Sequence, residues 1–159
     1  MIAQVHSGTL LGIEALPVIV EVDLQSGMQD GERNFIIVGL ADKAVMESKE
    51  RVRTAIKNSK LEFPNRKIMC NLAPGDIRKE GPYLDLPIAV AISAVQGLVP
   101  HSELEDTLFL GELGLDGNLR PINGAVNVAL MALEKGFKRL ILPAENAAEA
   151  AIAAKEGAS

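Results

Sequence analysis

Cysteine and aromatic residues are scarce in this sequence, and tryptophan is absent. The single cysteine, Cys70, excludes an internal disulfide and any metal site that needs several thiolates. Aromatic residues make up 3% of the chain, which weakens any function that depends on stacking nucleic-acid bases on aromatic side chains. The two histidines, His6 and His101, are isolated, and no His, Asp and Glu group has the spacing of a metal site. The core must therefore consist of Val, Ile, Leu and Ala, and we expect no metal in this chain.

Long hydrophobic runs are also missing. No apolar segment approaches the roughly 18 residues of a membrane span, and the N-terminal residues lack the basic and apolar regions of a signal peptide. We therefore expect a cytoplasmic protein that does not contact a membrane. Neither a P-loop motif nor a Gly-x-Gly-x-x-Gly motif after a strand occurs, so the chain should bind no nucleotide cofactor by itself.

Charge is distributed unevenly along the 159 residues. The formal net charge is −5, but residues 43–79 hold ten Lys and Arg against four Asp and Glu, whereas the remaining residues hold six against seventeen. A basic middle segment inside an acidic chain is the strongest charge signal in the sequence.

The stretch KEGPYLDLPIAVAISAVQGL, residues 79–98, predicts a Gly-Pro turn that leads into a helix apolar on most sides. Asp85 is expected to be the N-cap of this helix, with Pro87 in its first turn. Because such a helix is normally buried, we interpret it as the central core helix. The turn before it is interpreted either as an ordinary helix entry or as a site at which backbone amides meet a ligand.

Periodicity predicts the other elements. Asp42 has the properties of a helix N-cap, and Gly136 has those of a residue that ends a helix. Asp116-Gly117 predicts a hairpin. Cys70 alternates with polar residues and is interpreted as a small core residue. Strands are expected within residues 1–14 and at 18–25, 35–38, 67–72, 108–115 and 139–142, and helices at 42–59, 85–98, 124–135 and from 145 onward. This order predicts a single α/β domain, an α+β two-layer arrangement, over residues 1–159.

A basic stripe is expected on the helix at residues 42–59, because cations at i, i+4, i+8 and i+11 fall within roughly 80° of arc. Its residues could form a solvated face or contact DNA phosphates. The predicted nucleic-acid contacts are Lys49, Arg53, Lys57, Lys60, Arg66, Lys67, Arg78 and Lys79.

Three segments resemble the C-terminal proteolytic domain of Lon: EGPY before the core helix, GELGLDGNLRPINGA, and KGFKRLILPAEN. The resemblance implies a Ser nucleophile in the first segment and a catalytic Lys on the helix that the second segment opens. Here Tyr83 occupies the serine position and Val126 lies where a lysine is missing. A tyrosine hydroxyl without an adjacent base cannot replace the dyad, so the resemblance favours the fold and argues against peptidase activity.

Longer segments resemble the N-terminal domain of the YifB/ComM family of magnesium chelatase-like competence proteins: the opening MIAQVHSGTLLGIEALPVIVEVDLQSG, then FIIVGLADKAVMESKERVRTAIKNS, and NLAPGDIRKEGPYLDLPIAVAI. This resemblance implies a ribosomal-protein-S5-domain-2-type fold, like that of Lon, followed by an AAA+ ATPase domain that is absent from this chain. It also implies a hexameric DNA helicase that acts in branch migration during natural transformation. ATP and Mg²⁺ would belong to the missing ATPase domain.

Two functions follow as expectations. The domain could be a non-catalytic part of a DNA-processing ATPase that contacts DNA through the basic segment. It could instead be an assembly module in which acidic and basic regions of neighbouring copies meet in a homo-oligomeric ring. A residual Ser-Lys type peptidase is a remote third reading, and fold resemblance alone does not decide between these functions.

Overall fold

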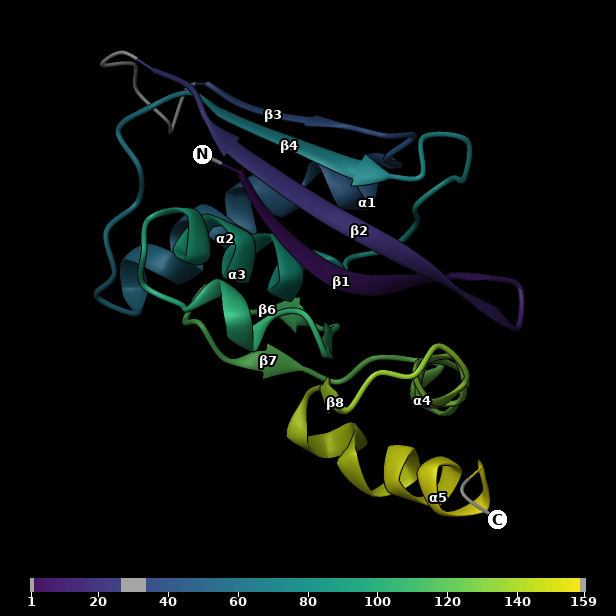
Figure 1. Ribbon diagram of the computed structural model, residues 1–159. Coiled ribbons are helices and arrows are strands. Elements are labelled where there is room, and N and C mark those ends of the chain that lie inside the picture. The colour runs from purple at the N-terminus through teal and green to yellow at the C-terminus, as the bar shows by residue number, and fades with distance from the viewer. Residues whose placement is uncertain (1, 27–33, 158–159) are drawn as a thin grey trace.

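The computed structural model describes residues 2–26 and 34–157 as a mixed α/β fold (Figure 1). Its main sheet has the strand order β3-β4-β2-β1-β5-β8. The β1–β2 and β2–β4 pairs are antiparallel, whereas β3–β4, β1–β5 and β5–β8 are parallel. The strands are β1 (Ile2–Leu11), β2 (Glu14–Leu24), β3 (Phe35–Val38), β4 (Ile68–Ala73), β5 (Thr107–Phe109) and β8 (Arg139–Ile141). The predicted α/β fold class is confirmed.

One predicted strand, residues 108–115, is wrong as a single element. The structure divides it into β5 and a short β6 (Glu112–Leu113), which forms a hairpin with β7 (Leu119–Arg120). The division falls at Gly111, whose N–H donates to the Tyr83 carbonyl at 2.9 Å, while Leu110 N–H still donates to Ile141 in β8. The chain therefore leaves the main sheet at this glycine. The predicted hairpin turn at residues 116–117 is confirmed.

The helices are α1 (Lys43–Met46), α2 (Ser48–Asn58), α3 (Asp85–Val95), α4 (Ala125–Glu134) and α5 (Ala147–Gly157), with short 3-10 turns η1 (His101–Glu103) and η2 (Ala144–Asn146). Asp42 caps α1 as predicted, because its carboxylate accepts a hydrogen bond from Val45 N–H at 2.8 Å. The single helix predicted over residues 42–59 is interrupted at Glu47, which separates α1 from α2.

The core lies between the sheet and the helices α2 and α3, which Figure 1 shows on one side of β1, β2 and β4. Alternate residues of β2 and β4 point into it, including Val20, Val22 and Cys70, which have no exposed surface. Helix α3 is buried on most sides, as its apolar sequence predicts. Among the described residues, no helix is long and apolar enough to cross a bilayer.

Candidate functional site

The carboxylate of Asp85 lies at the centre of a buried polar network that joins three elements. Ser48 Oγ on α2 donates to Asp85 Oδ1 at 2.5 Å. Arg51 Nε, also on α2, donates to Asp85 Oδ2 at 2.6 Å, and Leu113 N–H of β6 donates to the same oxygen at 3.0 Å. Asp85 thus fixes α2 and the β6–β7 hairpin against the start of α3.

The prediction that Asp85 is the N-cap of the core helix is wrong. The N-cap is Leu84, and Asp85 is the first helical residue with a fully buried side chain. A buried carboxylate needs strong partners, and Arg51 and Ser48 supply them from another helix. Burial raises the pKa of Asp85, while the hydrogen bonds from Arg51, Ser48 and Leu113 lower it. The network is therefore structural, since each of these donors already binds the carboxylate.

Sequence reasoning missed Ser48 and Arg51 as partners of Asp85. A signal was present, because Ser48 and Val52 are four residues apart on the buried side of α2. A serine at an apolar helix position indicates a polar partner in the core. Only the tertiary arrangement identifies that partner as Asp85, 37 residues further along the chain.

Tyr83 and Val126, where the resemblance to Lon predicts the positions of the protease dyad, lie on neighbouring segments. Tyr83 directly precedes α3, and its hydroxyl accepts a hydrogen bond from the backbone N–H of Asn123 at 3.3 Å. Val126 lies in the first turn of α4 and packs against the small cluster of Ala129, Ala150 and Ala153. The tyrosine hydroxyl thus meets a backbone amide instead of a base, and the lysine position faces an alanine-rich contact between α4 and α5. Within the described residues, the hydrogen-bond partner of the Tyr83 hydroxyl is a backbone amide, which cannot act as a general base.

The predicted DNA-contact residues differ in exposure. Lys57, Lys60, Arg66 and Arg78 are exposed, Lys49, Arg53 and Lys67 are half-buried, and Lys79 is fully buried. The prediction for Lys79 is therefore wrong: its ammonium group donates to the Pro74 carbonyl within the loop that precedes α3. Burial lowers the pKa of Lys79, and a side chain without exposed surface cannot reach a phosphate.

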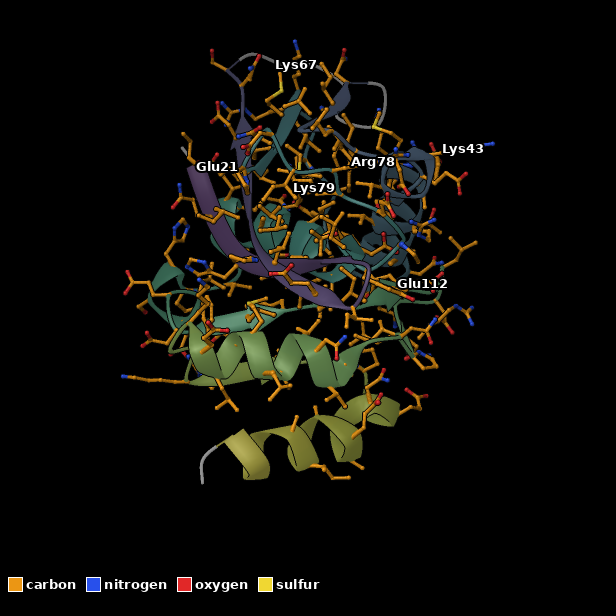
Figure 2. The ribbon with its side chains drawn as sticks, turned by 90° about the vertical axis from the view of Figure 1, so that its right-hand side faces the viewer. Glu21, Lys43, Lys67, Arg78, Lys79 and Glu112 are labelled. Carbon is orange, nitrogen blue, oxygen red and sulfur yellow. The ribbon has the colours of Figure 1, made fainter. Side chains whose placement is uncertain are left out.

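The predicted contact residues lie on different parts of the molecule. Figure 2 shows Lys67 at the upper end of the molecule, apart from Lys43 and Arg78. Arg78 forms a surface ion pair with Glu80 at 3.2 Å, and Arg53 forms one with Glu50. Arg66 donates to the Gln25 carbonyl at 2.9 Å.

The basic stripe on α2 is shorter than the sequence predicts. Lys49, Arg53 and Lys57 recur every four residues of the helix and lie on one side of it. Lys60 lies beyond the helical C-cap Ser59 in a left-handed conformation, with φ of 60°. We refer to the three helical cations Lys49, Arg53 and Lys57, together with Lys60 just beyond the helix, as the α2 basic stripe.

No group of three or more His, Cys, Asp and Glu residues that could hold a metal ion occurs in the part of the chain that the structure describes. The one cysteine, Cys70, is buried in β4. Burial raises the pKa of its thiol to about 12.

Together, the mixed sheet and the buried α3 helix define a Lon-like α/β domain. Comparison with known proteins then gives the family. Residues 20–146 match the family model described as subunit ChlI of Mg-chelatase. The chain belongs to this magnesium chelatase-like family, and within it to the YifB/ComM group.

Three relatives illustrate the similarity. The chain is 43% identical to the protein YifB of Salmonella typhimurium over 156 residues, which are 98% of this chain and 30% of that protein. It is 38% identical to the competence protein ComM of Haemophilus influenzae over 151 residues, 95% of this chain and 29% of ComM. It is 27% identical to the Lon protease of Rhizobium meliloti over 135 residues, 80% of this chain and 16% of that protease. The chain thus spans about 30% of the length of its YifB and ComM relatives.

Proposed function

We propose that this chain is a non-catalytic, Lon-like N-terminal domain of a cytoplasmic AAA+ ATPase that processes DNA, as in branch migration during natural transformation. The observation that carries the non-catalytic role is the pair of dyad positions, where Tyr83 binds the backbone of Asn123 and Val126 packs against alanines. ATP and Mg²⁺ would act in the ATPase domain of the longer hexameric protein, and no residue of this chain is assigned to them.

Contact with DNA is the first specific role that we propose. The α2 basic stripe supports it, because Lys and Arg clustered along one side of a helix are the electrostatic footprint of a nucleic-acid contact. Phosphate contacts release counterions, so binding should weaken steeply with salt. Arg66, Lys67 and Arg78 lie outside the stripe and would contribute only where the DNA reaches other faces of the domain.

The test is fluorescence anisotropy of the domain with labelled single-stranded, duplex and forked DNA across a salt series. A Lys57→Glu/Lys60→Glu variant is compared with a Lys135→Glu/Lys138→Glu variant, which makes the same charge change at two exposed lysines outside the basic segment. We expect the stripe variant to weaken binding at least tenfold and to reduce the duplex salt slope by about 1.8, since each lost phosphate contact removes about 0.9. Equal weakening of DNA binding by both variants would mean that binding depends on overall charge and not on the α2 basic stripe. No binding at low salt would refute DNA contact.

Assembly of subunits is the second role. The ion pairs Arg53–Glu50 and Arg78–Glu80 reduce the net positive field of the basic segment, and the rest of the chain is strongly acidic. A basic face of one copy against an acidic face of the next would form a head-to-tail ring. Sedimentation velocity of the full-length protein tests this role: Arg78→Glu should dissociate the oligomer while DNA affinity is retained. An intact oligomer in this variant and in the stripe variant would refute it.

A further inference from the structure

The turn between β1 and β2 carries an isoleucine that is 89% exposed, the highest exposure of any large apolar side chain among the described residues. Leu11 and Glu14 pair directly, so only Gly12 and Ile13 form the turn. Gly12 has φ of 67°, as the first central residue of a type II′ turn does. Such a turn requires the glycine but no aliphatic residue after it, so the local structure does not explain Ile13. We refer to residues 11–14 as the β1–β2 tip.

Helix α4 fixes the β1–β2 tip in position. Asn127 Nδ2 of α4 donates to the Ile13 carbonyl at 2.5 Å. Leu10, the residue before the tip, packs against Gly124, where an added Cβ atom would lie 2.5 Å from Leu10 Cδ1. Leu130 is exposed three residues after Asn127, on the same side of α4. The tip is therefore a fixed apolar projection, and a preorganised group loses little conformational entropy when it binds.

A small apolar pocket lies between α2, α3 and the β6–β7 hairpin. Its volume is about 140 Å³, roughly that of four to five water molecules at about 30 Å³ each. It can therefore hold the four carbon atoms of one isoleucine side chain. The apolar residues that line it include Ala55 and Ile56 of α2, Leu61, Ala89 and Val90 of α3, and Leu113 of β6. We refer to this cavity as the α2–α3 pocket.

The charges beside the tip and the pocket are complementary. Glu14 is the only charged residue among residues 7–20, and it is exposed beside Ile13. The α2 basic stripe ends at the pocket, because the exposed Lys60 lies between Ser59 and Leu61, which both line the cavity. A carboxylate that accompanies an apolar side chain into the pocket therefore meets a cation at its mouth.

Acidic residues near the mouth of the pocket do not cancel this positive charge. Glu62 follows one lining residue, and Asp116 precedes another. Asp116 accepts two hydrogen bonds from Asn118, one from the backbone N–H and one from the side-chain amide, both at 3.0 Å. Its two carboxylate oxygens are thus occupied within their own turn. Lys57 and Lys60 outnumber Glu62, so the mouth keeps a positive balance.

The β1–β2 tip and the α2–α3 pocket lie at opposite ends of the molecule. Figure 1 shows the purple turn between β1 and β2 at the right, and α2 and α3 at the left. Within one copy the tip therefore cannot reach the pocket. Between two copies, a contact that joins two different surfaces is heterologous, and its repetition gives a ring when the rotation closes.

We propose that Ile13 of one copy inserts into the α2–α3 pocket of a neighbouring copy, with Glu14 beside Lys60 of that neighbour. The contact rests on the assembly role proposed above and names the two surfaces that it uses. One inserted side chain and its rim bury much less than the roughly 1,200–2,000 Å² of a stable interface. The contact is therefore weak between single copies of residues 1–159, and it becomes stable when a closed ring repeats it.

Disulfide trapping tests the contact directly. Ile13→Cys protein is mixed with Leu61→Cys protein in a glutathione redox buffer, and the covalent heterodimer is followed on a non-reducing gel. Ile152→Cys protein mixed with Leu61→Cys protein is the matched control, because Ile152 is another exposed isoleucine, on α5. The native Cys70 is buried and does not compete. We expect the Ile13→Cys pair to form at least about tenfold faster than the control pair, and equal rates would overturn the proposal.

Exchange of the two charges tests the pairing at the rim. Glu14→Lys, added to the Ile13→Cys protein, should slow trapping about threefold, as expected for loss of an exposed ion pair. Lys60→Glu, added to the Leu61→Cys protein, should then restore the rate, because the two charges have changed places. A rate that falls further with both changes would show that Glu14 does not meet Lys60 and would overturn the proposed contact.

Sedimentation velocity of the full-length protein separates this contact from the assembly role in general. Ile13→Asn should shift the oligomer to smaller species, whereas Ile13→Val keeps a branched aliphatic side chain and should retain the oligomer. Because Ile13 is exposed, neither change should shift the Tm of the domain by more than about 2 °C. An oligomer that survives Ile13→Asn would refute this contact and leave assembly through another surface. A monomeric wild type would refute the assembly role itself, and with it this contact.

Discussion

Removing the carboxylate of Asp85 should cost this domain a large part of its stability. Asp85→Ala deletes one partner of the ion pair with Arg51 and leaves the Ser48 hydroxyl and the Leu113 N–H without their acceptor. Breaking a buried ion pair by removing one partner costs roughly 3–5 kcal/mol. The Arg51 side chain is 18% exposed and can recover some hydration, so we expect about 3–4 kcal/mol. Small domains have total stabilities of roughly 5–15 kcal/mol.

The assay is urea unfolding monitored by far-UV circular dichroism. Fluorescence is unsuitable because the chain has no tryptophan and a single tyrosine. Asp85→Asn keeps the side-chain volume and one acceptor oxygen. It should therefore lower the free energy of unfolding by less than Asp85→Ala does, by about 2 kcal/mol. Glu80→Ala is the exposed control, since its pair with Arg78 lies at the surface and should contribute no more than about 1 kcal/mol.

A double-mutant cycle with Arg51→Ala separates the pair from the other contacts of Asp85. The two single variants should each leave a buried group without its partner, so the double variant should be less destabilised than their sum by at least about 1 kcal/mol. A cost below about 1 kcal/mol for Asp85→Ala, or additive effects of the two changes, would refute the reasoning that the network holds α2 and the hairpin to α3.

Two further predictions concern titratable groups in the sheet. Burial raises the pKa of Cys70 to about 12, so at pH 8 a disulfide reagent should label native protein at least about 100-fold more slowly than urea-unfolded protein; equal rates would contradict its burial. Burial lowers the pKa of His6, whose ring lies 5.0 Å from that of Phe137. The folded state therefore binds this proton less readily than the unfolded state, and stability should fall as the pH drops below about 6.5. The urea midpoint should drop more between pH 7.5 and 5.5 in the wild type than in His6→Gln, and identical drops would exclude His6 as the cause.

Local features of the sequence were sufficient for most elements. Alternation of apolar residues predicted β2 and β4, and Asp42 predicted the start of the helix at α1, because side-chain periodicity and capping act over a few residues. The nearly continuous apolar run after Asp85 predicted a buried helix, which the position of α3 confirms. The assignment of Tyr83 and Val126 to the positions of the protease dyad comes from the resembling motifs and stays a prediction.

The partners of charged side chains depended on contacts between distant segments, which no local pattern contains. Aspartate is a residue type that commonly caps helices, which is why the sequence predicts a cap at Asp85. Its carboxylate instead binds Ser48 and Arg51, because α2 packs across the start of α3. Lys79 belongs to a basic segment by sequence, yet its side chain is buried and its ammonium group donates to the Pro74 carbonyl. The sequence by itself thus determined most of the elements and the core helix. Only the tertiary structure decided which charges are buried and which remain on the α2 basic stripe, because both depend on contacts between segments far apart in the sequence.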